Sequence, residues 1–219
     1  MIKAIVFDIG GVLAQDVWEH LYLDPAQGII ARYPELDAAA LEATGNRLWE
    51  RYAYTPAPKE LDWRILEREY WIAFIQEMQA VLPTSLSPDE FIDLTDDFVQ
   101  PIEGMPDLMS RLAGQGLALA ICSNNNEFWY ARQAERLNLE ALIPHENVIL
   151  SSRVGASKSS PNFEMFKAVS ESLRCKDPEC LFIDDRPGNV DRAKQFGMQS
   201  VLFDGTSLLV KTLHNLGIR

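Results

Sequence analysis

Positive charge is scarce in this sequence of 219 residues: 20 lysines and arginines stand against 32 aspartates and glutamates, and the formal net charge is −12. Phosphate backbones and anionic membranes repel such a surface, so neither nucleic acid nor a membrane is an expected partner. An anionic small substrate would need a local source of positive charge. A divalent cation or a buried lysine is therefore the feature to expect if the substrate is anionic.

Cysteine and long apolar runs are also rare. The three cysteines, Cys122, Cys175 and Cys180, show no zinc-type spacing with the three histidines, and free thiols indicate a reducing compartment. The chain reaches Asp8 after an apolar core too short for a signal peptide, and no stretch approaches the length of a bilayer span. We therefore expect a soluble, cytoplasmic protein. A hydrophobic content of 47% excludes the disordered and fibrous classes.

Five short apolar runs lack polar–apolar alternation, which predicts strands buried on both faces. A segment with helical spacing precedes each of the last four runs, so the sequence predicts an α/β fold with a doubly wound, parallel, five-stranded sheet. The runs are Lys3–Phe7, Leu117–Cys122, Asn147–Leu150, Cys180–Ile183 and Gln199–Phe203. The helical segments between them are Met105–Gln115, Glu127–Leu137, Phe163–Leu173 and Pro187–Phe196.

About a hundred residues separate the first two runs, far more than one crossover helix requires. Within this interval, Asp37–Tyr52 and Glu60–Val81 show helical spacing and carry aromatic residues such as Trp49 and Trp71. We interpret these aromatic residues as the core of the interval rather than as a ligand site. The sequence thus predicts an all-helical cap domain at residues 15–98, inserted into an α/β core domain of residues 1–14 and 99–219.

Polar residues follow three of the predicted strands. Asp8 follows the first strand, Ser123 and Asn124 come at the end of the second, and Asp184 and Asp185 follow the fourth. In open α/β sheets, ligands bind outside the carboxyl ends of the strands. We therefore expect these side chains to meet at one edge of the sheet.

Each of these residue types has a chemical role at such an edge. Clustered carboxylates repel one another unless a cation joins them, and carboxylate oxygens are the ligands that suit Mg²⁺. A carboxylate held there can attack phosphorus. Lys158, Ser123 and the backbone amides after the turn at Gly10 and Gly11 can hold the remaining phosphoryl oxygens.

Four motifs, taken in chain order, resemble those of the haloacid dehalogenase-like (HAD) hydrolase superfamily. They are Phe-Asp-x-Gly-Gly-Val-Leu, Ser-Asn after a strand, Lys158, and Phe-Ile-Asp-Asp-Arg-Pro-x-Asn-Val. The resemblance covers residues 1–13 and about 101–203, and the helical insertion corresponds to the cap of many members. The residues of these motifs are similar to those of the phosphatases that include the N-terminal domain of soluble epoxide hydrolases and bacterial sugar-phosphate phosphatases.

The resemblance implies a magnesium site. Asp8 would be the nucleophile and a metal ligand, and an aspartyl phosphate would form on it. Asp185 would bind the metal directly, and Asp184 directly or through water. The backbone carbonyl of Gly10 would be the remaining protein ligand. The implied cofactor is therefore Mg²⁺.

The resemblance also implies which residues bind the substrate, a small phosphorylated metabolite. Ser123 and Lys158 would bind the transferring phosphoryl group and take part in catalysis. The backbone amide of Asn124 would assist, and Gly11 belongs to the same glycine-rich turn. Neither the identity of the metabolite nor the oligomeric state follows from the sequence.

Position 10 departs from the family pattern, because phosphatases of this group carry a second aspartate where this sequence has Gly10. The missing group is the general acid–base, which contributes about 10²–10⁴-fold to the rate. Three hypotheses remain open. The first is a phosphatase that takes a substitute group from the cap or solvent, or that turns over slowly on a good leaving group. Asp16 and His20 lie closest in sequence, but we interpret each as a solvated or helix-capping side chain rather than as the substitute.

The second hypothesis is a metal-independent dehalogenase, in which Asp8 attacks carbon and no aspartate is needed at position 10. This hypothesis gives Asp184 and Asp185 no role, because displacement at carbon does not use magnesium. The third is a weakly catalytic or non-catalytic binding protein that retains the fold.

Overall fold

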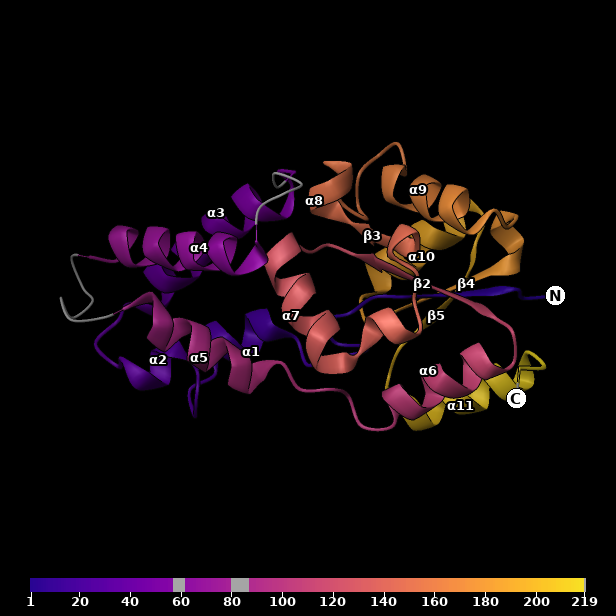
Figure 1. Cartoon of the computed structure of the whole chain (residues 1–219), viewed down its shortest axis with the longest axis horizontal. Helices are drawn as coiled ribbons and strands as arrows, with labels where there is room; N and C mark the ends of the chain where they lie inside the picture. The colour runs from indigo at the N-terminus through magenta and orange to yellow at the C-terminus, as the bar shows by residue number, and fades with distance from the viewer. Residues whose placement is uncertain (57–61, 80–86, 219) are drawn as a thin grey trace.

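A five-stranded parallel sheet lies at the centre of the structure, a computed structural model that describes residues 1–56, 62–79 and 87–218 (Figure 1). The strand order is β3-β2-β1-β4-β5. The strands are β1 (Ala4–Phe7), β2 (Ala118–Ser123), β3 (Val148–Leu150), β4 (Cys180–Asp184) and β5 (Gln199–Leu202). All five expected strands are present, and each end lies within one residue of the prediction. The predicted α/β fold class is therefore confirmed.

Helices cover both faces of the sheet because the side chains of each buried strand alternate between two apolar clusters. On β1, Ile5 and Phe7 pack in one cluster, and Ala4 and Val6 pack in the other. The first face is covered by α6 (Met105–Gly114), α7 (Glu127–Leu137) and α11 (Thr206–Asn215), and the second by α9 (Glu164–Leu173) and α10 (Pro187–Phe196). A short helix, α8 (Ser151–Val154), follows β3.

Strand β5 differs from the expectation that every strand is buried on both faces. Its residues are exposed or half-buried, and Leu202 retains 45% of its accessible surface. The reason is its place at the edge of the sheet, where it pairs only with β4. An apolar run therefore identified the strand without showing how far the strand is covered.

In the described part of the chain, five of the helices between β1 and β2 form a separate group, which lies to the left of the sheet in Figure 1. They are α1 (Val17–Leu23), α2 (Ile29–Arg32), α3 (Ala38–Ala53), α4 (Trp63–Glu77) and α5 (Pro88–Phe98). Side-chain caps fix the starts of α3 and α4: Asp37 accepts from the amide of Ala39, and Asp62 accepts from that of Arg64. Residues 60–61 and 80–81 of the expected second helix lie outside the described residues.

These five helices share an apolar cluster of their own. Tyr70, Trp71 and Phe74 of α4 are fully buried in it, as the sequence interpretation requires. Two residues of α7, Phe128 and Trp129, complete the cluster from the other side. Helix α7 therefore packs both on the sheet and on the inserted helices.

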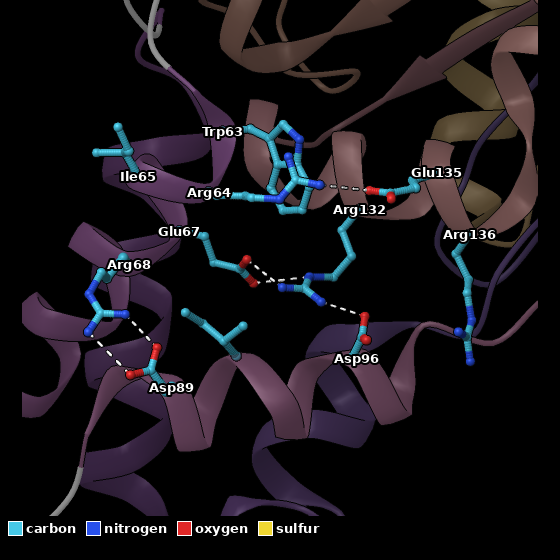
Figure 2. Close-up of a pocket in the computed structure, with 11 residues that line it drawn as sticks. Trp63, Arg64, Ile65, Glu67, Arg68, Asp89, Asp96, Arg132, Glu135 and Arg136 are labelled. Atoms are coloured by element: carbon cyan, nitrogen blue, oxygen red, sulfur yellow. Dashed lines mark hydrogen bonds and ion pairs between the residues drawn. The ribbon is translucent and has the colours of Figure 1, made fainter.

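An ion-pair network also joins the inserted helices to α7. Figure 2 shows Arg132 of α7 between Glu67 of α4 and Asp96 of α5, and its Nε donates to Glu67 Oε1 at 3.1 Å. The Glu67 side chain is 1% exposed. The network lines a surface groove of about 770 Å³, in which Arg68 and Asp89 form a further ion pair. Because most of its charged groups pair with one another, with Arg136 the exception among the described residues, we assign this groove to packing between helices.

The chain enters and leaves the inserted helices at one place. Ala14 forms an antiparallel bridge with Pro101, the amide of Gln15 donates to the carbonyl of Gln100 at 2.9 Å, and that of Ile102 donates to Leu13 at 2.9 Å. Within the described part of the chain, no helix has the length and apolarity needed to cross a bilayer.

Candidate active site

Three strands end in polar residues at the same edge of the sheet. Phe7 of β1 lies opposite Ile183 of β4, so the residues that follow, Asp8 and Asp184, are level with one another. Ser123 is the last residue of β2, on the other side of β1. The predicted convergence of these side chains therefore follows from the register of three adjacent strands.

Lys158 joins the carboxylates of two of these strands. Its Nζ lies 2.6 Å from Asp8 Oδ2 and 2.6 Å from Asp184 Oδ2, and its side chain is 1% exposed. The loop after α8 brings it there, because the amide of Lys158 donates to the side-chain oxygen of Asn124 at 2.9 Å. Lys158 is thus the buried cation that the acidic composition led us to expect.

Burial and charge set the protonation of this group. Burial, the largest influence, raises the pKa of Asp8 to about 7 despite the attraction of Lys158, and repulsion from Asp184 acts in the same direction. The hydroxyl of Ser123 donates to Asp8 and lowers its pKa. For Lys158, burial lowers the pKa, but the attraction of the two carboxylates outweighs it and leaves that pKa raised. Lys158 therefore carries a positive charge at neutral pH.

Asp184 is fully buried and fixed from several sides. Beyond Lys158, it accepts from Nδ2 of Asn189 at 3.0 and 3.1 Å and from the amide of Arg186 at 2.9 Å. Several donors of this kind hold a buried carboxylate in one orientation. Asn189 and Arg186 therefore shape the loop that carries the acidic pair.

Asp185 completes a cluster of three carboxylates. One oxygen each from Asp8, Asp184 and Asp185 lies within 4.8 Å of the other two, and no other such group of potential metal ligands occurs in the described ranges. The Oδ1 atom of Asp185 is buried without a hydrogen-bond partner. Burial, followed by repulsion from Asp184, raises the pKa of Asp185. An all-oxygen set with a buried, unpartnered ligand atom fits a hard divalent cation such as Mg²⁺.

Gly11, expected to bind substrate, lies at the turn after β1, and its amide donates to the carbonyl of Ala14 at 2.9 Å. It also makes room for the acidic pair. Its φ is +75°, and a Cβ atom at this position would lie 2.5 Å from Asp185 Oδ2. Only glycine satisfies both conditions without strain.

A cavity of about 280 Å³ opens above these groups, and it is lined from both the sheet edge and the inserted helices. Five of the sequence-predicted residues line it: Asp8, Gly10, Ser123, Asn124 and Lys158. Gly11, Asp184 and Asp185 are not part of the lining. The inserted helices and the segment that follows α3 contribute Asn46, Trp49 and Tyr54.

Some residues of the cavity were not identified from the sequence. Trp49 was interpreted as core, but it stacks on Trp129 with 4.8 Å between ring centroids and lines the cavity. Arg186 lines the cavity as well, and its Nη2 lies 3.1 Å from Asp16 Oδ2. Of the two nearby candidates for the missing acid–base, Asp16 lines the cavity. His20 instead pairs with Asp24 at 3.7 Å.

Comparison with known sequences identifies the same class of enzyme. A family model described as haloacid dehalogenase-like hydrolase matches residues 2–197. A curated relative, flavin mononucleotide hydrolase 1 of Arabidopsis thaliana, is 32% identical over 117 residues. This match covers 53% of the chain and 46% of that protein, so it spans about half the length of the relative.

Solved structures share the fold over the whole chain. A HAD-like hydrolase from Porphyromonas gingivalis superposes with a TM-score of 0.68 at 22% identity, covering 100% of this chain and 99% of its own. The magnesium complex of a HAD family enzyme from Bacteroides thetaiotaomicron also gives a TM-score of 0.68, at 19% identity, covering 95% and 98% of the two chains. An L-2-haloacid dehalogenase from Xanthobacter autotrophicus gives 0.58 at 21% identity, covering 99% and 83%.

Proposed function

This chain belongs to the haloacid dehalogenase-like hydrolase family, and from this premise we propose that it is a magnesium-dependent phosphatase acting on a small phosphorylated metabolite. Asp8 is the proposed nucleophile. The observation that carries the proposal is the cluster of Asp8, Asp184 and Asp185 beside the buried Lys158. A dehalogenase that attacks carbon has no use for such a cation site, so the cluster favours attack on phosphorus.

Asp8, Asp184 and Asp185 would hold the magnesium ion, together with the carbonyl of Gly10, and the bound ion would offset the negative charge of the phosphoryl oxygens. The relatives support this choice of cofactor and substrate class. A structure of the B. thetaiotaomicron enzyme contains magnesium and inorganic phosphate, and the Arabidopsis relative is named as a flavin mononucleotide hydrolase.

Lys158 orients the nucleophile and neutralises it. In the first step, an oxygen of Asp8 forms a bond to phosphorus and the leaving group departs, which gives an aspartyl phosphate. Asp8 loses its carboxylate charge in this step, but Lys158 stays in place because Asp184 holds it at 2.6 Å. Lys158 and the hydroxyl of Ser123 then face the phosphoryl oxygens, where a buried cation and a donor stabilise developing charge.

The inserted helices select the substrate in this proposal. Residues 15–98 form a cap domain over the core of residues 1–14 and 99–219, with the paired linkers at their junction. Asn46, Trp49 and Tyr54 line the same cavity as Asp8 and come from the cap side of the chain. With a volume of about 280 Å³, the cavity suits a small leaving group with polar atoms and one flat or apolar face.

Phosphate release over a panel of phosphorylated metabolites, measured with and without Mg²⁺, tests this function. We expect release that depends on Mg²⁺ and is abolished by Asp8→Asn, which removes the nucleophilic charge at nearly constant shape. Asp204→Asn is the matched control, because Asp204 also follows a strand but is exposed and lies outside the lining of the cavity. This control should retain full activity.

The other two hypotheses give different results in the same experiment. Halide release from 2-haloacids without Mg²⁺ would identify a dehalogenase. If no substrate is turned over and a binding partner is retained by Asp8→Asn, the chain acts through binding, and the phosphatase proposal is wrong.

A further inference from the structure

The space beside Gly10 is filled by another carboxylate. Gly10 has no positive φ, and a Cβ atom built on it would meet nothing nearer than the side chain of Asp16, with Cγ at 3.8 Å and Oδ2 at 4.0 Å. The carboxylate that position 10 lacks in the chain is thus present beside it in space.

A tight turn after β1 brings the two residues together. The carbonyl of Ile9 accepts from the amides of Leu13 at 2.8 Å and Ala14 at 3.0 Å, and Gly10 forms a bridge with Ala14. The pairing of Gln15 with Gln100 then fixes the next step of the chain. Asp16 is therefore placed by backbone contacts on both sides of the turn.

Asp16 also faces the reaction centre. It lines the same cavity as Asp8 and Lys158, and its carboxylate is oriented by Arg186 at 3.1 Å. The side chains of Arg186 and Asp16 are 60% and 21% exposed, and their pairing fixes where the Asp16 carboxylate lies.

We propose that Asp16 is the general acid–base residue of this enzyme and replaces the aspartate that position 10 lacks. The inference rests on the proposed phosphatase function. His20, the other nearby candidate, is engaged by Asp24 and does not line the cavity.

The two half-reactions then balance. In the first, Asp8 bonds to phosphorus, the bond from phosphorus to the ester oxygen breaks, and that oxygen takes a proton from the carboxylic acid of Asp16 to leave as an alcohol. In the second, the Asp16 carboxylate takes a proton from water. The resulting hydroxide bonds to phosphorus, the bond between phosphorus and the Asp8 oxygen breaks, and its electron pair returns to Asp8. The products are inorganic phosphate and protonated Asp16.

A competing role for Asp16 is structural, because it directly precedes α1 and its carbonyl accepts from the amide of His20. Asp16→Asn separates the two roles, since asparagine caps a helix about as well as aspartate but cannot act as a general base. Asp24→Asn is the matched control: it removes a carboxylate that pairs with His20 but lies outside the cavity.

The test measures kcat, KM and the phosphorylated fraction of Asp8, by acid quench and intact-protein mass spectrometry, on a substrate the wild-type enzyme hydrolyses. With a substrate whose leaving group departs without protonation, only the second step needs Asp16, so for Asp16→Asn we expect kcat to fall about 10²–10⁴-fold, with little change in KM and accumulation of phosphorylated Asp8. Asp24→Asn should match wild type. Adding Gly10→Asp to Asp16→Asn should restore part of kcat, because the space at position 10 accepts a Cβ.

An Asp16→Asn variant with wild-type kcat overturns the inference, and so does one whose kcat falls without accumulation of the phosphoenzyme. If Asp16→Asn does not fold, as judged by thermal denaturation, Asp16→Ser serves the same test because serine also caps helices. Mg²⁺-dependent activity that Asp8→Asn abolishes and Asp16→Asn leaves intact would refute the role of Asp16 alone. If the wild-type chain releases no phosphate from any substrate, the proposed function fails as well.

Discussion

Two adjacent glycines offer a matched pair of substitutions at the active-site turn. Gly11→Ala places a Cβ atom 2.5 Å from Asp185 Oδ2 and 2.7 Å from its Cγ, at a φ of +75°. Gly10→Ala places one 3.8 Å from its nearest neighbour, with no positive φ. The same methyl group is therefore added at neighbouring positions, and only one of the two disturbs the carboxylate cluster.

Two effects set the magnitude for Gly11→Ala. A residue with a Cβ in the left-handed region costs about 1–2 kcal/mol, which corresponds to a fall in Tm of about 2–8 °C for a chain of this size. In addition, the contact with Asp185 must open from 2.5 Å to the 3.4 Å at which ordinary van der Waals contact begins, a shift of about 0.9 Å. Magnesium sites tolerate ligand displacements of roughly 0.2 Å, so the affinity for Mg²⁺ should fall about 10–100-fold.

The assay combines thermal denaturation of the metal-free protein with calorimetric titration of Mg²⁺. We expect Gly10→Ala to have a Tm and an affinity for Mg²⁺ near those of the wild type, and Gly11→Ala to lower both. If Gly11→Ala binds Mg²⁺ as tightly as Gly10→Ala, then Asp185 is not a ligand or its carboxylate moves freely. The assignment of the cation site would then be refuted.

Three further predictions concern charge and packing. Because burial raises the pKa of Asp8 to about 7 from an ordinary 3.8, the stability this group contributes is full below pH 3.8 and is lost as the pH rises through 7. The rise in Tm on adding Mg²⁺ should therefore be larger at pH 8 than at pH 5.5. Arg132→Met alone leaves the buried Glu67 unpaired and should lower the free energy of unfolding in urea by about 3–5 kcal/mol, whereas adding Glu67→Leu should recover most of it. Trp71→Ala, at a fully buried ring, should cost about 3–5 kcal/mol in the same assay. Equal Tm shifts on adding Mg²⁺ at both pH values would contradict the argument from the pKa of Asp8. A double variant no more stable than Arg132→Met would contradict the one from the buried ion pair. Wild-type stability in Trp71→Ala would contradict the one from core packing.

The sheet and its polar edge could be predicted from sequence because both depend on local patterns. Each strand is a short apolar run, and Asp8, Ser123 and Asp184 stand at the ends of such runs. The alternation of strands and helices along the chain predicts a parallel sheet, in which these strand ends lie at one edge. Helix α11 was not anticipated because it follows the last strand, beyond the alternation on which the prediction rested.

Contacts between segments that are distant in the sequence could not be predicted. The ion pair of Arg186 with Asp16 joins residues 170 positions apart, and no local signal records it. The role of Gly11 depends on the path of a loop that arrives from β4, and its engaged amide depends on a turn closed by Ala14. Trp49 resembles any other apolar residue of a helix, and only packing shows that it also borders the cavity.

The junction of the two linkers also bears on how the chain folds. Strand β1 is the first strand to be synthesised, but its Ala4 pairs with Ala118 and Cys180. The central strand can therefore pair only with segments that are far away in sequence. Closing so long a loop would be slow if the intervening chain were unstructured. Once the inserted helices have gathered around Trp71, however, Leu13 and Ile102 are neighbours, and β1 reaches β2 through a short effective connection. The helices that border the cavity would thus also shorten the effective loop that closes when β1, the strand that leads to Asp8, pairs with β2.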